Sequence, residues 1–462
     1  MLGSSCPRRR GGGRGASTRG VAPPGGFVYS RFPVHILYSF FLALALMVLL
    51  PVYFVRMRLM KKKPLSLFPR LGFPLPDRVP GRLSLWVHAV SVGEVISLQK
   101  LLQEIKSRHP DWALHVSVLT AAGMEVARQK LTMADRLFFA PFDFGWTVKR
   151  FVRRLEPGLL VLAESELWPN LLRQAGKRTR GVLVVNGRIS ERSFRRYKRL
   201  RPLAVRLFKN VSLYLVQTEQ DRQRLIESGM SADRVRVAGN LKCDIMPPEV
   251  EADRLARLAG EISLPPGKKL LVAGSTREGE EQLLIEAFVE AGRSGAVSAL
   301  ILAPRHVDRV SEVERICRES GLRVERRTGV RTGRDWEVLI LDTIGELAGF
   351  YALCDAAFIG GSLVPWGGHN LIEPAAYGKP IFFGPHMQNF AFLARAFLES
   401  GAARLVARRE DLREMFLLSD PEDLKARGKR SLQTLKGLQG ATERTLRTIE
   451  SLAAGTSRSE GT

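Results

Sequence analysis

The segment GGSLVPWGGHNLIEPAAYGKP, residues 360–380, surrounds a single carboxylate, Glu373, with several glycines and places it directly before a proline. It follows an apolar run that is typical of a buried strand, and we expect a helix to begin near Leu371. Backbone N–H groups of a glycine-rich loop, together with the positive end of a helix, suit a phosphate. Glu373 could then accept two hydrogen bonds from a ribose diol, or it could only cap the helix. The spacing leaves both interpretations open.

A second motif, HAVSVGEV at residues 88–95, places Ser91 and Gly93 at the end of a strand-like run and Glu94 at the start of the next helix. From the sequence alone, Glu94 is first of all a negative charge that favours a helix N-terminus. A carboxylate that is partly desolvated at the edge of a cleft can also have a raised pKa and act as a general base.

Further charged side chains follow other strand-like runs. In ESELWPN, Glu164 and Glu166 follow such a run and could contact a polar ligand, with a solvated surface charge as the alternative. The stretch NGRISERSFRRYKRLR is strongly basic, and guanidinium groups can bind phosphate oxygens in pairs. Arg188 and Arg192 could bind the phosphate of a ligand in this way; a helix face that contacts anionic headgroups is the other interpretation.

The elements that must position these residues alternate along the chain. Apolar runs such as LSLWVHAV (83–90) and KLLVAGS (269–275) are separated by amphipathic helical patterns, which predicts α/β domains with parallel sheets covered on both faces. Two such series flank a polar, proline-containing stretch. We expect two domains that face across a cleft, with their sites at the carboxyl ends of the strands. The expected boundaries are 60–238 for the first domain, 239–418 for the second, and 419–462 for a charged amphipathic helix and tail.

Composition limits the possible partners. Among 462 residues, 71 Lys and Arg against 46 Asp and Glu give a net charge of +25, which favours nucleic acid, anionic lipid or phosphorylated substrates. The four cysteines are far apart and suggest neither a zinc site nor a disulfide framework. The sequence contains no Walker A motif, and no GxGxxG follows the first strand, so a nicotinamide dinucleotide fold is disfavoured.

The N-terminus combines a basic, glycine-rich segment with an apolar one. We expect residues 1–31 to be disordered and residues 32–57 to form a helix that anchors the chain to a membrane, because about 23 uncharged residues suffice to cross a bilayer. A cleaved signal peptide is disfavoured because the run is long and lacks a small-residue cleavage site. A buried core helix is the alternative.

Several blocks together resemble one family. HAVSVGEV, ESELWPN, NGRISERSFRRYKR, GNLKCD, GSTREGEE, APRH, DTIGELAGFY and the glycine-rich segment are similar, in the same order, to motifs of the 3-deoxy-D-manno-octulosonic acid (Kdo) transferases, which are GT-B glycosyltransferases. The resemblance covers residues 60–415. It implies two Rossmann-like domains that transfer Kdo from CMP-Kdo to a tetraacyl lipid A precursor in lipopolysaccharide biosynthesis, at the cytoplasmic face of the inner membrane, with inversion and without a metal or cofactor.

The resemblance also implies roles for individual residues. Glu94 would be the catalytic base. The residues expected to bind the donor are Lys242, Ser275, Thr276, Arg277, Arg305, His306, Gly345, Glu346, Leu347, Asn370 and Glu373. The residues expected to contact the acceptor are Ser91, Gly93, Glu164, Glu166, Arg188 and Arg192.

The chain departs from the family pattern at some positions. Arg277 stands where the family usually has histidine, which keeps a cation and removes a neutral imidazole. A different membrane-associated GT-B transferase that uses a UDP-sugar is the nearest alternative. A non-catalytic basic adaptor for membrane or nucleic acid is another, but the sequence has no basic platform interleaved with aromatic residues, so nucleic acid is not an expected partner.

Overall fold

The computed structural model describes residues 34–59, 67–247, 249–264, 267–293, 298–330, 335–417 and 420–455. The predictions for residues 1–31 and for the last residues of the chain fall outside these ranges. Two seven-stranded sheets form the cores of the described chain, as the alternating pattern predicts. Every strand pairing in them is parallel.

The first sheet is buried on both faces, which explains why its strands are continuous apolar runs. Its strands, in spatial order, are β3 (Arg136–Phe139), β2 (Trp112–Val118), β1 (Leu83–Ala89), β4 (Leu159–Ala163), β5 (Gly181–Gly187), β6 (Leu213–Val216) and β7 (Val235–Val237). The order reverses between β1 and β4. In open α/β sheets, this switch point is where a ligand crevice forms at the carboxyl ends of the strands.

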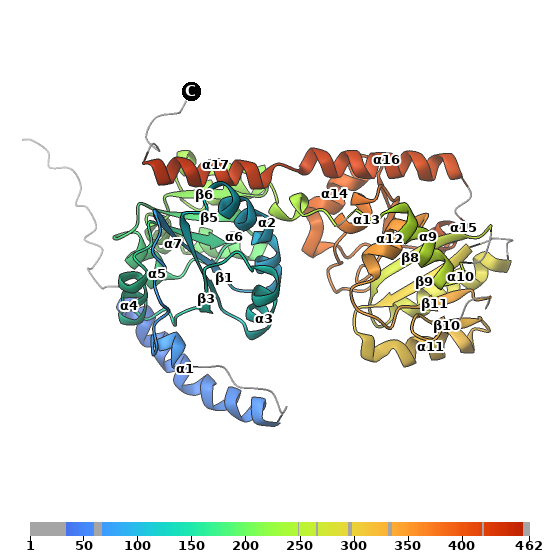
Figure 1. The fold of residues 1–462 in the computed structure, drawn as a ribbon, viewed down its shortest axis with the longest axis horizontal. Helices are drawn as coiled ribbons and strands as arrows, with labels where there is room; N and C mark the ends of the chain where they lie inside the picture. Colours follow the sequence, from blue (N-terminus) through green and yellow to red (C-terminus); the bar gives the residue numbers. More distant parts are fainter. Residues whose placement is uncertain are drawn as a thin grey trace, which may run out of the picture.

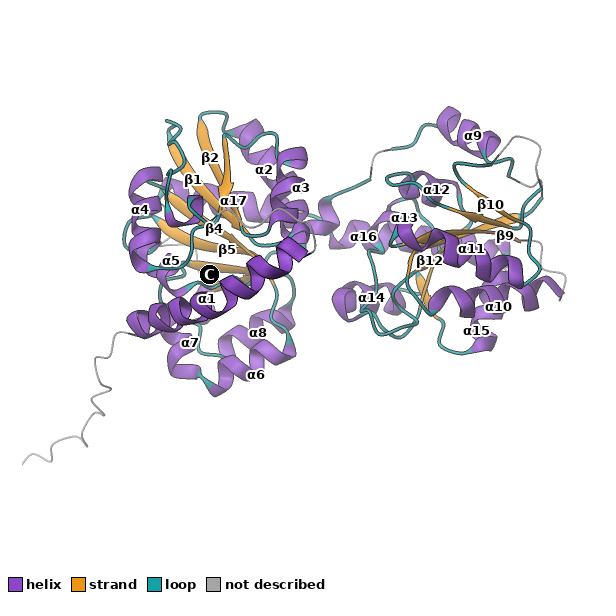
Figure 2. Cartoon of the chain, turned by 90° about the horizontal axis from the view of Figure 1, so that it is seen from below, coloured by secondary structure: helices purple, strands orange, loops and turns teal. Residues whose placement is uncertain are grey.

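Helices cover both faces of the first sheet (Figure 2). On one face lie α2 (Val92–Arg108), α3 (Ala121–Lys130) and, from the far end of the chain, α17 (Ala441–Ala454). On the other face lie α4 (Gly145–Leu155), α5 (Pro169–Ala175), α7 (Arg201–Phe208) and α8 (Glu219–Glu227), with α6 (Glu191–Arg199) outside them. The short helix η1 (Pro69–Leu71) precedes β1, and η2 (Ala232–Arg234) precedes β7.

The second sheet also reverses its order at one point, between β8 and β12. Its strands, in spatial order, are β10 (Val324–Arg326), β11 (Val338–Ile340), β9 (Ser298–Pro304), β8 (Lys269–Thr276), β12 (Ala356–Ile359), β13 (Ile381–Phe383) and β14 (Ala403–Leu405). Its helices are α9 (Ala252–Glu261), α10 (Glu280–Arg293), α11 (Val310–Glu319), α12 (Leu347–Leu353), α13 (Ile372–Ala376), α14 (Ala391–Glu399), α15 (Arg409–Leu417) and α16 (Pro421–Leu438), with η4 (Val307–Arg309) and η5 (Gln388–Phe390).

The chain passes between the two sheets twice. The first passage contains η3 (Leu241–Asp244), and the second joins α16 to α17 at Gly440, whose φ of 94° breaks the helix. The buried Asp244 carboxylate accepts the N–H groups of Gly440 and Thr442, so the two passages are bonded to each other. The prediction of one helix in 420–453 is therefore wrong, because its second half returns to pack on the first sheet (Figure 1).

The apolar N-terminal segment forms α1 (Val34–Leu59), which contains Pro51. Within the described residues, α1 is the helix that is long and apolar enough to cross a membrane. It contacts α5 of the first domain, where the Asn170 amide donates to Ser39 Oγ at 3.1 Å.

Candidate active site

Glu94 lies in the first turn of α2, which follows the switch-point strand β1 after a short connection, and it forms a capping box there. Ser91 is the N-cap, and its hydroxyl donates to Glu94 Oε1 at 3.0 Å, while the N–H of Val90 donates to Oε2 at 2.7 Å. The side chain is 5% exposed. Burial raises the pKa of Glu94 to about 7, helped by the negative charges of Glu164 and Glu166 and opposed by these two hydrogen bonds. Glu94 therefore caps the helix, as the first interpretation predicts. Its raised pKa also lies in the range that suits a general base.

The neighbouring strand of the switch point, β4, brings two more carboxylates to the same edge. Glu164 has a φ of 53°, a left-handed conformation that costs energy for a residue with a side chain. Glu166 accepts a hydrogen bond from the Trp168 indole at 3.1 Å. The Nζ atom of Lys242 in η3 lies 3.8 Å from Glu164 Oε1. Gly93 lies next to the same ammonium group, because a Cβ atom added at Gly93 would be 3.8 Å from Lys242 Nζ. Lys242, expected at the donor, therefore faces this acidic edge, which also contains Ser91.

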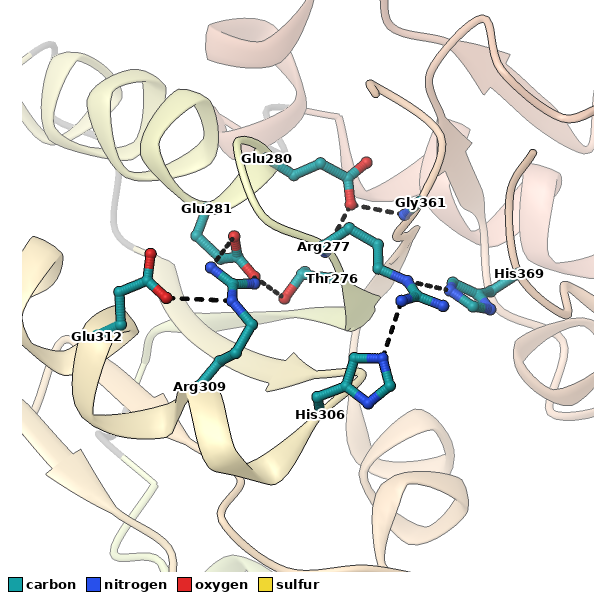
Figure 3. A network of polar contacts seen from close by, with 9 residues as sticks. All are labelled: Thr276, Arg277, Glu280, Glu281, His306, Arg309, Glu312, Gly361 and His369. Carbon is teal, nitrogen blue, oxygen red and sulfur yellow. Dashed lines mark hydrogen bonds and ion pairs between the residues drawn. The ribbon is translucent and has the colours of Figure 1, made fainter. Parts of the chain in front are cut away.

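The second domain presents a cationic cluster at the carboxyl ends of β8 and β9 (Figure 3). Arg277 donates from Nε to His369 at 3.2 Å and from Nη1 to His306 at 3.0 Å. Its guanidinium also lies over the Trp366 ring, 4.7 Å from the centroid. These contacts fix the cation beside the glycine-rich loop, and the exposed Arg305 follows the end of β9.

His369 is held neutral by this cluster. Burial, together with the positive charges of Arg277 and Arg305, lowers its pKa to about 4. A neutral imidazole can accept the hydrogen bond from Arg277 Nε without repelling it. The departure at Arg277 from the family's usual histidine therefore leaves a site with a permanent cation supported by an uncharged imidazole.

The glycine-rich loop does not offer the amide groups that we expected for a phosphate. Glu280, fully buried at the start of α10, accepts the N–H groups of Gly361, Ser362 and Leu363 as well as that of Arg277. The prediction is wrong for these three loop amides, because a carboxylate of the same domain already binds them. The helix that follows, α13, has only five residues and contributes little dipole.

A second internal carboxylate removes Thr276 from the expected donor contacts. The Thr276 side chain is fully buried, and its hydroxyl donates to Glu281 at 2.9 Å, where Arg309 completes an ion pair at 2.9 Å. Ser275, by contrast, sits at a bulge of β8 with a φ of 59°. Ser275 thus remains the hydroxyl of this pair that can meet a ligand.

Glu373 lies on α13, which begins where the sequence predicts it. Its Oε1 accepts a hydrogen bond from the Asn370 amide at 3.2 Å, and Asn370 Oδ1 accepts the N–H of Ile372. Burial raises the pKa of Glu373, and the Asn370 hydrogen bond opposes this rise. The carboxylate is partly exposed and oriented by Asn370, and it therefore keeps acceptor capacity for a ligand.

Gly345 and Glu346 line a cavity of about 600 Å³, together with residues of α9 and α12. Glu346 is paired there with Arg327 at 3.1 Å, and Thr343 donates to it. The Glu346 carboxylate is therefore occupied. Tyr377 also lines this cavity and lies near Glu373, so the cavity extends toward that carboxylate.

Arg188 differs from its expected place at the acceptor. From the end of β5 it donates to the carbonyls of Asn389 at 3.0 Å and Gln388 at 2.8 Å, which belong to η5 of the second domain. Asn389 in turn donates to the Trp366 carbonyl. Arg188 thus joins the carboxyl edge of the first sheet to the glycine-rich loop of the second, and its terminal nitrogens are already engaged.

A separate cavity of about 450 Å³ opens beside the acidic edge. Its lining is mixed, with the polar side chains of Glu166 and Arg196 and the apolar side chains of Leu200, Leu203 and Leu207 of the α6–α7 region. Arg192 is exposed on α6. A lining of this kind can hold a molecule that has both polar and apolar parts.

The structure adds residues that the sequence analysis did not assign to the site. Glu280, Glu281 and Arg309 support the cationic cluster, and His369 and Trp366 hold Arg277. Trp366 and His369 were visible in the motif, but their partner lies 92 positions away from His369, and no local pattern indicates it. Within the described ranges, no group of three or more His, Cys, Asp and Glu side chains is arranged to hold a metal ion.

Comparison with proteins of known family identifies the family of this chain. The family model for 3-deoxy-D-manno-octulosonic-acid transferase matches residues 65–245. A transferase of that name from Chlamydophila psittaci is 30% identical over 393 residues, which cover 84% of this chain and 89% of the relative. A bifunctional glycosyltransferase/methyltransferase from Fusobacterium nucleatum is 32% identical over 320 residues, 68% of this chain, and the match spans 49% of that longer protein.

A solved glycosyltransferase from Rickettsia africae shares the fold, with a TM-score of 0.59 over 82% of this chain and 99% of that one at 9% identity. The two parallel sheets confirm the expected GT-B architecture. The chain belongs to the 3-deoxy-D-manno-octulosonic acid transferase family of glycosyltransferases.

Proposed function

We propose that the protein transfers Kdo from CMP-Kdo to a hydroxyl of a tetraacyl lipid A precursor, with inversion at the anomeric carbon and without a bound metal. One observation carries the proposal: a buried carboxylate with a pKa near 7, Glu94, stands at the switch point of one sheet, and a fixed cation, Arg277, stands at the switch point of the other.

In this reaction the acceptor hydroxyl attacks the anomeric carbon while Glu94 takes its proton. The bond from that carbon to the phosphate oxygen breaks, and CMP leaves with the electron pair. Arg277 and Arg305 stabilise the negative charge that develops on the phosphate, because they are already in place before the reaction. His369, whose pKa is lowered to about 4, stays neutral and does not compete for that charge.

The nucleotide would be bound by the second domain. Glu373, oriented by Asn370, would accept hydrogen bonds from the ribose diol, and Ser275 would donate to the phosphate. The exposed His306, next to Arg305, would contact the phosphate or the cytosine. The backbone of Gly345 at the adjoining cavity would be a further donor contact, with Leu347 close by at the start of α12.

The acceptor would bind at the first domain. The cavity between Glu166 and the leucines of α6–α7 fits a molecule with polar and apolar parts, and Arg192 supplies a cation for its phosphate. Glu164 and Lys242 border the position where the reacting sugar would lie, and Ser91 and Gly93 border Glu94.

A lipid acceptor requires contact with a membrane. The exposed apolar face of α1 supports membrane association, and the reaction would take place at the cytoplasmic face of the inner membrane.

The test is to incubate the purified full chain with CMP-Kdo and a tetraacyl lipid A precursor and to measure the lipid products by mass spectrometry. We expect species heavier by one or more Kdo units, and their number reports how many are added. Parallel reactions with UDP-sugars test the nearest alternative, and oligonucleotide binding tests an adaptor role. Absence of Kdo-bearing lipid, with transfer from a UDP-sugar instead, would overturn the proposal.

A further inference from the structure

We propose that α1 lies along the membrane surface and that a basic pocket beside it binds the phosphate headgroup of an anionic phospholipid. The pocket is defined by Lys149, Arg173, Lys177 and Arg178 and is called the α4–α5 pocket below. The inference rests on the membrane association proposed above, and it concerns a site separate from that of the acceptor.

The α4–α5 pocket has a volume of about 480 Å³ and is lined by these four cations and Gln174. In the part of the chain that the structure describes, none of the four makes an ion pair. The nearby Arg154 of α4, by contrast, is paired with Asp77 at 3.2 Å. Four unneutralised cations around one concave site, without an acidic lining residue, call for an anion from outside the chain.

The pocket lies at the beginning of α1. Asn170 of α5 donates to Ser39 at 3.1 Å, and the charges of Arg173 and Lys177 act on His35, one turn earlier in α1. A phosphate in the pocket would therefore lie beside the first turns of the apolar helix. This is where a lipid headgroup lies when an apolar helix is inserted at the interface of a membrane.

The burial pattern of α1 indicates how the helix is oriented. Half-buried residues recur every three or four positions along its whole length, at His35, Tyr38, Ser39, Leu42, Leu46, Leu50, Tyr53, Phe54 and Met57. This is one face of an α-helix, and it is the less exposed face; near its beginning the helix contacts α5. Near the far end, Tyr53 lies close enough to the buried Arg70 of η1 to interact with its charge.

The opposite face of α1 is apolar and exposed, with Phe41, Val48 and Val55 each more than half exposed. A helix that crosses a bilayer needs about 20 residues surrounded by lipid. Because α1 contacts α5 near its beginning and Tyr53 lies near Arg70 of η1 toward its end, crossing would require the helix to leave the domain. If α1 lies parallel to the membrane, its less exposed face can stay on the side of the protein while its exposed apolar face contacts lipid.

This orientation also serves the acceptor site. Trp168, which lines the acceptor cavity, is the N-cap of α5, and Arg173 lies in the last turn of the same helix. The two cavities share no lining residue. A headgroup bound at the C-terminal end of α5 would fix the distance between the membrane surface and the acceptor cavity at the N-terminal end of the helix.

The experiment compares the full chain with the variant Arg173→Gln/Lys177→Gln in vesicle sedimentation. The matched control is Lys425→Gln/Lys429→Gln on α16, where both lysines are exposed, and α16 lies on the side of the molecule opposite α1 (Figure 1). Vesicles contain phosphatidylcholine alone or with added phosphatidylglycerol. We expect the pocket variant to bind the anionic vesicles roughly 25-fold more weakly, at roughly fivefold per cation, with the control variant unchanged.

The outcomes separate this proposal from the function proposed above. Equal loss in both variants would overturn the pocket and indicate only general charge attraction. Strong binding of inorganic phosphate without vesicles, competing at constant ionic strength, would assign the pocket to free phosphate instead. Kdo transfer to detergent-dispersed acceptor should be the same in wild type and both variants, and its absence in all three would count against the proposed function alone.

For the helix itself, Phe41→Trp and Val55→Trp place a probe on the same exposed face, 14 residues or about 21 Å apart along the axis. Quenching by lipids brominated at known depths should report the same depth for both. A difference close to the full separation would show that α1 crosses the bilayer.

Discussion

The carboxyl edges of the two sheets carry opposite charges, although the sheets are built alike. The first edge gathers Glu94, Glu164 and Glu166, and the second gathers Arg277 and Arg305 with two imidazoles. Burial acts on both: it raises the pKa of Glu94 to about 7 and lowers the pKa of His369 to about 4. Desolvation therefore favours the neutral form of both side chains, and the neighbouring charges shift the pKa of each in the same direction as burial does.

This difference separates two tasks of the proposed reaction. An acidic edge with a carboxylate that titrates near neutrality can accept a proton from a hydroxyl. A cationic edge in which His369 stays neutral keeps the positive charge of its arginines available for a departing phosphate. Arg188 connects the two edges through the carbonyls of η5. The charged residues of either edge can therefore be substituted while this contact between the domains remains.

The largest effect is expected on the acidic edge. Glu94→Gln keeps the shape of the capping side chain but cannot take a proton, so we expect turnover to fall by about 10²–10⁴-fold with CMP affinity unchanged. Steady-state rates and calorimetric CMP titration measure the two quantities. Glu125→Gln, an exposed acid on α3, is the control and should keep full activity. Wild-type turnover in Glu94→Gln would remove the base from the mechanism.

The next effect is expected on the cationic edge. Arg277→Met removes the charge that His369, His306 and Trp366 hold in place, and we expect CMP binding to weaken by about 1.5–3 kcal/mol, roughly 10- to 150-fold. Arg277→His should recover part of the affinity. Arg315→Met, an exposed cation on α11, serves as control. Unchanged CMP affinity in Arg277→Met would place the phosphate elsewhere.

A smaller effect should identify the ribose contact. Glu373→Gln keeps one acceptor oxygen but loses its charge, and we expect CMP binding to weaken by about 1 kcal/mol, roughly fivefold. Titration with dCMP, which lacks one hydroxyl of the diol, should show a much smaller difference between variant and wild type. An equal loss for CMP and dCMP would indicate that Glu373 supports the fold of the loop and does not bind the ribose.

The smallest effect is a shift along the pH axis. The base acts when it is deprotonated, so kcat/KM of the wild type should fall about tenfold per pH unit below about pH 7. In Glu164→Gln the loss of a neighbouring negative charge should lower the pKa of Glu94, so the fall should begin at lower pH. If the pH profile of Glu164→Gln is the same as that of the wild type, the charge of Glu164 does not influence the pKa of Glu94.

Local patterns predicted the parts of the molecule that depend on burial alone. The strands near 83–90 and 269–275 were predictable because a parallel strand buried on both faces must be continuously apolar. The positions of Glu94 and Arg277 followed, since each comes directly after such a strand. The start of α13 was also predictable from the glycines and the proline around it.

Contacts between distant segments were not predictable. The glycine-rich loop has the composition of a phosphate site, yet Glu280, 81 positions before Gly361, occupies its amides. Arg188 looked like an acceptor cation because its sequence neighbours are basic, but its guanidinium lies against η5, 200 and 201 positions away. Sequence spacing gives the edge on which a side chain lies, and only the folded chain gives its partner.

The most direct test of the central claim is a crystal structure of the inactive Glu94→Gln variant with CMP-Kdo. The account predicts the donor phosphate within hydrogen-bond distance of Arg277, the ribose against Glu373, and the anomeric carbon turned toward residue 94. A donor bound away from Arg277, or a side chain at position 94 directed away from the sugar, would contradict the account.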